Sequence, residues 1–125
     1  MNLPLHVLLV EDVPIAQTVA TKILTRLGFS VDVAGDGGEA VEFFEKKKYD
    51  LILMDIALPT QDGFETAKQM RDREWHEFRI PIIALSANYD PSSRTACLGA
   101  GMDEFLSKPL TKEKVLNIVQ RFFST

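Results

Sequence analysis

The chain has 125 residues, of which 46% are hydrophobic and 26% are charged, and its formal net charge is −4. These values are typical of one folded domain with a core of ordinary size, and the acidic balance argues against wholesale binding of nucleic acid, which needs a basic surface. The one cysteine, Cys97, excludes an internal disulfide framework and favours a reducing compartment.

The first part of the chain predicts a strand, a helix and a second strand. Residues 5–10 are a short run rich in leucine and valine, typical of a buried strand. A helix is expected from Pro14, with apolar residues at four-residue spacing facing inward. This stripe consists of Ile15, Val19, Ile23 and Leu27, with Ala16, Ala20 and Leu24 beside it. Residues 30–34 alternate in polarity and indicate a second strand nearer an edge.

The middle of the chain predicts two more helices and a strand between them. Asp36 and Glu39 have the spacing of a capping box and are expected to open a helix. Residues 51–54 are wholly apolar and predict a strand that is covered on both faces. The turn-forming residues 58–63 then lead into a third helix.

The last third predicts two strands and two helices. Residues 82–85 are a fourth buried strand, and Asp90 with Pro91 forms the start signal of a helix. Residues 104–107 form a short fifth strand, after which Thr111 caps a final helix. Five strands in strict alternation with five helices predict an α/β fold, a parallel sheet with helices on both faces.

Polar side chains follow four of these strands at the point where each strand ends. Glu11 and Asp12 follow the first strand and Asp55 the third. Ser86 follows the fourth strand and Lys108 the fifth. Ligands of open α/β sheets bind beyond the carboxyl ends of the strands, and in the flavodoxin-like order 2-1-3-4-5 these four strands are neighbours. Three carboxylates, a hydroxyl and an ammonium group are therefore expected to meet at one end of the sheet.

This set of groups points to a metal ion and to phosphoryl transfer. Carboxylates at such short distances repel one another, by roughly a few kcal/mol per pair at about 4 Å and an effective dielectric constant of about 20. A hard divalent cation relieves the repulsion, and oxygen ligands favour Mg²⁺, for which Mn²⁺ is expected to substitute. A carboxylate beside Mg²⁺ and a lysine can attack phosphorus, and the product is a labile acyl phosphate.

The segments VLLVEDVP, DLILMDIALPTQDGFE, PIIALSA and GAGMDEFLSKPL resemble the receiver domain of two-component response regulators. The resemblance spans residues 1–125, so we expect one receiver domain. It implies that Asp55 accepts a phosphoryl group from a phosphohistidine on a partner. It also implies that Mg²⁺ is bound by Asp12, Asp55 and the carbonyl of Ala57, with Glu11 acting through a metal-bound water.

The same resemblance implies how the phosphoryl group is sensed. Ser86 would donate a hydrogen bond to its oxygens and Lys108 would pair with it, with a cis peptide between Lys108 and Pro109. Phe105 would change rotamer when Ser86 moves. The signal would then reach the surface of the fourth helix, fifth strand and fifth helix as a population shift.

Two positions depart from the commoner family pattern. The switch hydroxyl belongs to Ser86 rather than to a threonine, and Phe105 stands where the family often has tyrosine. An output that relies on the tyrosine hydroxyl is therefore not implied. Ala57 and Asn88 occupy the positions, two beyond Asp55 and the switch residue, that tune phosphoryl lifetime in the family.

In the segments LLVEDVPIAQTVATKIL, PIIALSAN and GMDEFLSKP, the chain is similar to receivers of hybrid sensor histidine kinases. This implies a histidine kinase or a histidine phosphotransfer domain as partner. The isolated domain would be no conventional enzyme beyond catalysing its own phosphorylation and dephosphorylation, although the parent chain could be a histidine kinase. A standalone response regulator is the open alternative. A homodimer through the first and fifth helices, or through the fourth helix, fifth strand and fifth helix, also stays open.

Three other functions fit the sequence less well. A phosphohydrolase of the haloacid dehalogenase type needs a second aspartate where this chain has Ala57. A flavodoxin-like cofactor binder needs a hydroxyl- or glycine-rich phosphate loop after the first strand, where Glu11 and Asp12 would repel phosphate in the absence of a metal. A degenerate receiver that serves only for docking would lack some of the site residues, and all of them are present.

The location expected for this domain is the cytoplasm. No apolar run approaches the length that spans a membrane. Residues 1–4 lack the charged and apolar regions of a signal peptide. We expect no membrane contact by this domain itself, and it could be the cytoplasmic part of a membrane-bound hybrid kinase.

Overall fold

The computed structural model describes residues 4–58, 62–74, 79–87 and 91–123. Within these residues, five strands alternate with five helices along the chain. They are β1 (His6–Val10), α1 (Pro14–Arg26), β2 (Ser30–Ala34), α2 (Gly37–Lys46), β3 (Leu51–Asp55), α3 (Gly63–Arg73), β4 (Ile82–Ser86), α4 (Pro91–Gly99), β5 (Glu104–Ser107) and α5 (Lys112–Phe123). All strand pairs are parallel, in the order β2-β1-β3-β4-β5, which confirms the predicted architecture.

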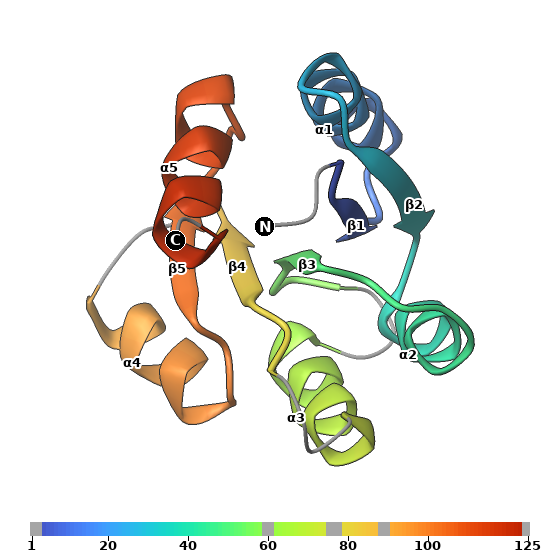
Figure 1. Ribbon diagram of the computed structural model, residues 1–125. Helices are drawn as coiled ribbons and strands as arrows, with labels where there is room; N and C mark the ends of the chain where they lie inside the picture. The colour runs from blue at the N-terminus through green and yellow to red at the C-terminus, as the bar shows by residue number, and fades with distance from the viewer. Residues whose placement is uncertain (1–3, 59–61, 75–78, 88–90, 124–125) are drawn as a thin grey trace.

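Helices cover both faces of the sheet, α1 and α5 on one side and α2, α3 and α4 on the other (Figure 1). Successive side chains of a strand point to opposite faces, so each strand feeds two core clusters. The cluster beneath α2, α3 and α4 includes Leu8, Ile52 and Ile82. The cluster beneath α1 and α5 includes Leu9, Leu53 and Ile83. Burial on both faces explains why β3 and β4 read as continuous apolar runs.

Two strands extend one residue further than the apolar runs predicted. β3 includes Asp55 and β4 includes Ser86. Asp55 lies opposite Leu85 in the sheet, and Ser86 lies opposite Ser107. The sheet ladder therefore holds the backbone of both polar residues, which end their strands although the apolar runs stop one residue earlier.

Side-chain caps begin several helices. Asp36 accepts a hydrogen bond from the backbone N–H of Glu39 at 2.8 Å, as the capping-box spacing predicts, while the Glu39 carboxylate accepts from the N–H of Gly35. Thr111 accepts from Lys114 N–H at 3.2 Å and caps α5 as expected. The Asp90 cap lies outside the described residues, and α4 begins at Pro91.

Gly63 opens α3 directly against the end of β3. Its N–H donates to the carbonyl of Ile56 at 3.0 Å. A Cβ at this position would lie 2.7 Å from Ile56 Cα and 2.8 Å from the carbonyl oxygen of Asp55. The missing side chain thus lets the chain turn back immediately after Asp55. Asp62 caps the same helix through the N–H of Glu65, a cap that the sequence analysis did not predict.

The predicted inward stripe of α1 is wrong in its first half. Ile15 and Val19 are 74% and 46% exposed, whereas Ala20 and Leu24 are buried. Ala20 and Leu24 belong to the core cluster beneath α1 and α5, whereas Ile15 and Val19 lie outside it. An apolar surface is left uncovered on α1.

Among the helices of the described segments, none is long and apolar enough to cross a membrane.

Candidate functional site

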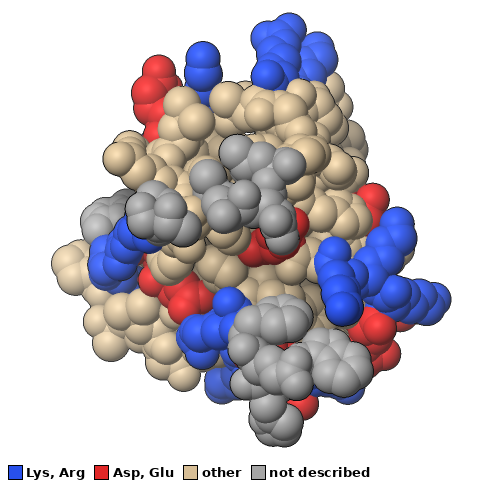
Figure 2. All heavy atoms as spheres, in the orientation of Figure 1, with Lys and Arg blue, Asp and Glu red and all other residues tan. Residues whose placement is uncertain are grey.

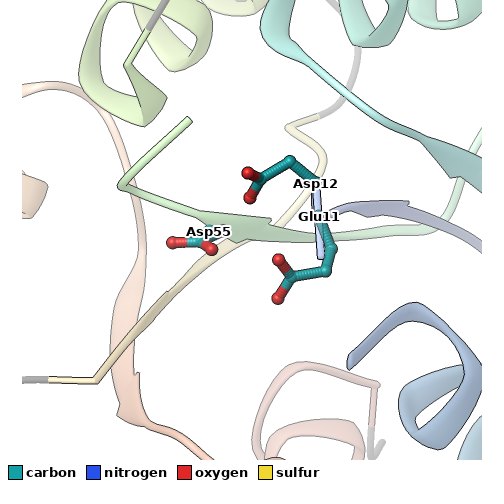
Figure 3. A group of neighbouring side chains, drawn as sticks. All are labelled: Glu11, Asp12 and Asp55. Carbon is teal, nitrogen blue, oxygen red and sulfur yellow. The ribbon is translucent and has the colours of Figure 1, made fainter. Parts of the chain in front are cut away.

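The site lies where β1, β3, β4 and β5 end. Glu11 and Asp12 directly follow β1, and Asp55 is the last residue of β3. Figure 3 shows the three carboxylates converging, two from the end of β1 and one from β3. Because β1 and β3 are paired neighbours in the sheet, residues more than forty positions apart along the chain meet there, as the strand order predicts.

The three carboxylates form a group that suits a hard cation. One carboxylate oxygen from each of Glu11, Asp12 and Asp55 lies within 4.8 Å of the others. Glu11 and Asp55 are buried, so their mutual repulsion is weakly screened by water. The ligand atoms are all oxygens, which is the donor set that Mg²⁺ prefers. The residues present therefore fit a magnesium ion.

Lys108 bridges the two buried carboxylates. Its Nζ lies 2.6 Å from Glu11 Oε1 and 2.7 Å from Asp55 Oδ2. Burial would lower the pKa of Lys108, but the hydrogen bonds to Asp55 and Glu11 outweigh this and raise it. Burial raises the pKa of Glu11 above its usual value, and the hydrogen bond from Lys108 offsets part of the effect. One ammonium ion thus neutralises part of the acidic cluster.

Backbone groups orient the carboxylates before any ligand arrives. Asp55 Oδ1 accepts a hydrogen bond from Ala57 N–H at 2.9 Å, and Glu11 Oε2 accepts from Val13 N–H at 3.1 Å. The Gln17 side chain donates to the Glu11 carbonyl at 2.6 Å. The Ala57 carbonyl as a metal ligand stays a prediction, since what the structure records for Ala57 is its N–H contact.

The two residues expected to sense the phosphoryl group lie on β4 and β5. Ser86 is buried at the end of β4, and its carbonyl accepts from Lys108 N–H at 2.7 Å. Phe105 is buried in the cluster beneath α2, α3 and α4. The Lys108–Pro109 peptide is cis. Neither the hydroxyl contact of Ser86 with phosphate nor the rotamer change of Phe105 is tested by this arrangement. Asn88 lies outside the described residues.

Sequence reasoning missed Lys114, which holds the connection between β5 and α5. Its Nζ donates to the Ser107 carbonyl at 2.7 Å, to the Ser107 hydroxyl at 3.1 Å and to the Pro109 carbonyl at 3.0 Å. These contacts support the backbone on both sides of Lys108. The sequence did contain a signal for Lys114, because a positive charge in the first turn of a helix is unfavourable beside the positive end of the helix dipole. Such a lysine is expected to find a hydrogen-bond acceptor outside its own helix.

Comparison with known proteins identifies the family. Residues 7–120 match the family model of the response regulator receiver domain. The aerobic respiration control sensor protein ArcB of Escherichia coli is 41% identical over 126 residues, a match that covers all of this chain and 16% of ArcB. The chain therefore spans about a sixth of this curated relative.

Two solved structures are also similar. The receiver domain of the sensor histidine kinase PA1611 from Pseudomonas aeruginosa has a TM-score of 0.87 and 41% identity, covering 97% of this chain and 98% of that one, with a magnesium ion in its active-site cleft. The receiver domain of Ssk1, crystallised with the phosphotransfer protein Ypd1 of Saccharomyces cerevisiae, has a TM-score of 0.87 and 28% identity, covering 94% and 88%. With the strand order, the acidic cluster and the family match in agreement, this chain belongs to the response regulator receiver domain family.

Proposed function

We propose that this domain is the phosphoacceptor of a two-component phosphorelay and that Asp55 is the residue phosphorylated. The observation that supports this most directly is the contact of one lysine, Lys108, with two buried carboxylates beside a third. Such a cluster is strongly unfavourable unless cations neutralise it. It is also what a nucleophilic carboxylate needs around it when a charged phosphoryl group arrives.

Asp12, Asp55 and the carbonyl of Ala57 would bind Mg²⁺, with Glu11 acting through a metal-bound water, and Mn²⁺ would bind to the same oxygen ligands. Bound there, the ion supplies positive charge for the oxygens of the transferred group. The comparison with the magnesium-containing PA1611 receiver domain supports this assignment.

In the transfer step, a carboxylate oxygen of Asp55 attacks phosphorus while the N–P bond of the partner phosphohistidine breaks. The bonding electrons leave with the imidazole, which takes up a proton from solvent. Ala57 N–H keeps the Asp55 carboxylate oriented during the attack. Lys108, whose Nζ lies 2.7 Å from Asp55 Oδ2, would move its hydrogen bond from Asp55 to a phosphoryl oxygen.

Ser86 and Phe105 are proposed to transmit the modification. Ser86 ends β4, and β4 pairs with β5, so a movement of Ser86 toward the phosphoryl group would act on the strand that carries Phe105. Phe105 is buried in the core cluster beneath α2, α3 and α4, so a change of its rotamer would alter the packing under these helices. The output surface would be α4, β5 and α5, in keeping with a population shift.

The uncovered apolar surface on α1 supports docking of a phosphodonor protein. A groove of about 340 Å³ runs between α1 and the connection after β5, and Glu11 and Lys108 of the site also line it. Its apolar lining includes Ile15, Ala16, Val19, Leu85, Pro109 and Leu110. An apolar helix face that carries the phosphohistidine would bury this surface and bring the donor to Asp55. The Ypd1 complex of the related Ssk1 receiver supports a histidine phosphotransfer domain or histidine kinase as partner.

Basic side chains beside this groove are relevant to the question of a homodimer. A second groove of about 430 Å³, which shares Val19 with the first, is bordered by Lys22, Arg26 and Lys112. Figure 2 shows blue side chains projecting at the top of the molecule, on the side that α1 covers. A twofold homodimer through α1 and α5 would bring these like charges together. Charge therefore favours an acidic partner over a second copy at this surface.

We further propose that the domain works as one module of a hybrid sensor histidine kinase, on the cytoplasmic side. The small share of ArcB that it spans supports a larger parent chain. The free, buried thiol of Cys97 suits a reducing compartment. The net charge of −4 supports a protein partner rather than a nucleic acid.

The test is phosphorylation with Mg²⁺ and a small phosphodonor, followed by intact-mass spectrometry of the wild type and of Asp55→Asn. We expect one phosphate adduct on the wild type and a large loss of adduct in the variant. An adduct of equal yield on both proteins would place the acceptor elsewhere.

A further inference from the structure

Helix α4 is held to the rest of the fold by little apolar burial. Cys97 is the one residue of α4 that is buried, whereas each of the other helices of the described segments buries two or more. Leu98 on the same helix is exposed. Because tertiary packing supplies most of the stability of a short helix, polar contacts are expected to matter more for α4 than for its neighbours.

One buried carboxylate joins α4 to α5 around the open edge of the sheet. Glu104 is the first residue of β5, and its side chain is 9% exposed. Arg94 of α4 donates to Glu104 Oε1 at 2.9 Å, and Arg121 of α5 donates to Glu104 Oε2. In Figure 1, β5 is the edge strand, with α4 on one side and α5 on the other. The three side chains therefore connect α4 and α5 through the edge strand β5.

The two arginine contacts differ in what their loss would cost. A buried carboxylate without a partner is unfavourable, but Arg121 keeps Glu104 paired when Arg94 leaves. The Arg94 side chain is 41% exposed and gains water on release. Loss of the Arg94 contact should therefore cost little, with an expected effect of about two- to fivefold on the opening equilibrium of α4, as for other partly exposed ion pairs.

This contact lies next to the proposed switch. Glu104 Oε1, the oxygen that Arg94 uses, also accepts a hydrogen bond from the backbone N–H of Phe105 at 3.0 Å. Phe105 packs in the same core cluster as Cys97 of α4. A displacement of Phe105 would therefore disturb both contacts that hold α4, the apolar one and the ionic one.

We propose that the Arg94–Glu104–Arg121 cluster is a latch that holds α4 against β5 and that opens at Arg94 when Asp55 is phosphorylated. The opening on phosphorylation of Asp55 depends on the proposed function. The restraint of α4 depends only on the contacts of the three side chains.

The single cysteine of the chain reports on α4 directly. Cys97 is 0% exposed, and burial raises the pKa of its thiol to about 11. A thiol reagent therefore reacts only when α4 separates from the sheet. Under native conditions we expect Arg94→Gln to speed the modification of Cys97 about two- to fivefold relative to wild type.

Arg73→Gln is the matched control. Arg73 is 43% exposed and pairs with Glu45 between α3 and α2, so the variant loses the same charge and a similar ion pair away from α4. Arg94→Lys, which keeps the positive charge, should recover part of the wild-type protection. Urea midpoints of all variants separate local opening from global unfolding. Equal Cys97 rates in Arg94→Gln and Arg73→Gln would overturn the latch.

The coupling to Asp55 is tested on protein whose phosphorylation is verified by intact mass. We expect phosphorylated wild type to react faster at Cys97 than unphosphorylated protein, and Arg94→Gln to gain less from phosphorylation because its latch is already open. A phosphorylated wild type with an unchanged Cys97 rate would overturn the coupling. Failure to form the adduct at Asp55 would instead refute the proposed function, while the comparison of Arg94→Gln with Arg73→Gln would still decide the restraint of α4.

Discussion

Replacing Lys108 by methionine tests whether the acidic cluster depends on a cation. The Nζ of Lys108 contacts Glu11 Oε1 at 2.6 Å and Asp55 Oδ2 at 2.7 Å, and both carboxylates are buried. Methionine keeps much of the apolar stem and removes the charge. Loss of one partner from a buried ion pair costs about 3–5 kcal/mol. Because the Lys108 side chain is 24% exposed, so that water partly screens the pair, we expect a loss of about 2–4 kcal/mol in the free energy of unfolding without Mg²⁺.

Mg²⁺ should reverse much of this loss. In Lys108→Met the carboxylates lack their ammonium partner, so a divalent cation binds without competing against it. Ligand binding to the folded state stabilises it in proportion to the logarithm of ligand concentration over the dissociation constant. The difference between the variant and wild type should therefore shrink as Mg²⁺ rises, and the variant should show the larger shift in urea midpoint.

The pH dependence gives a second readout of the same reasoning. The pKa of Glu11 is raised in the folded state, chiefly by burial. The stability that Glu11 contributes is therefore fully present below its unfolded pKa, where the carboxyl is protonated, and is lost as pH rises through its folded-state pKa. Without Lys108 this loss should be larger, and the deficit of Lys108→Met should grow as pH rises above the ordinary glutamate pKa of about 4.3.

The assay is urea unfolding followed by circular dichroism, with and without Mg²⁺, and the control is Lys112→Met. Lys112 is exposed on α5, so its loss removes the same charge without uncovering buried carboxylates. We expect Lys112→Met to change stability by about 0.5 kcal/mol or less. If Lys108→Met and Lys112→Met had equal stability without Mg²⁺, or if Mg²⁺ left the Lys108→Met deficit unchanged, the electrostatic account of the site would be wrong.

Three further changes test other parts of the structure. Gly63→Ala places a Cβ 2.7 Å from the nearest backbone atom, and should cost about 1–3 kcal/mol in urea unfolding and weaken stabilisation by Mg²⁺; a neutral substitution would contradict the tight turn. Burial would raise the pKa of Asp32, but hydrogen bonds from Tyr49 and a lysine hold it lower, so Asp32→Asn should destabilise at pH 7 and converge with wild type as pH falls below about 4. Ile15→Asp should slow phosphotransfer from a histidine phosphotransfer protein about tenfold but leave phosphorylation by a small donor unchanged, and Leu98→Asp on α4 is its control; equal slowing by both would count against docking on α1.

The sheet and the position of the site could be predicted from local pattern alone. Apolar runs such as 51–54 and 82–85 are unambiguous because strands buried on both faces have no polar side to alternate with. The polar residue that ends each run then falls at one end of the sheet, since parallel strands share a direction. Asp55 and Ser86 lie one residue beyond the apolar runs and still within the strands, because hydrogen bonds of the sheet ladder do not depend on side-chain polarity.

The helices were less well determined by their sequence. Spacing alone placed Ile15 and Val19 of α1 inward, yet both are exposed. Four-residue spacing marks an apolar face without saying how much of it the sheet can reach, and that depends on the neighbouring helix. The contacts of Lys114 with the chain around Lys108 depend on how α5 packs after a connection whose course local sequence does not determine.

Residue order along the chain determined by itself which groups could form this site, because strand periodicity and the direction of a parallel sheet are local and repetitive properties. The tertiary structure alone decided that one ammonium group, from Lys108, lies between Glu11 and Asp55, and that Glu104 receives arginines from two different helices. Contacts of this kind join side chains that are distant in the sequence, and their geometry depends on how helices settle on the sheet, which no spacing rule records.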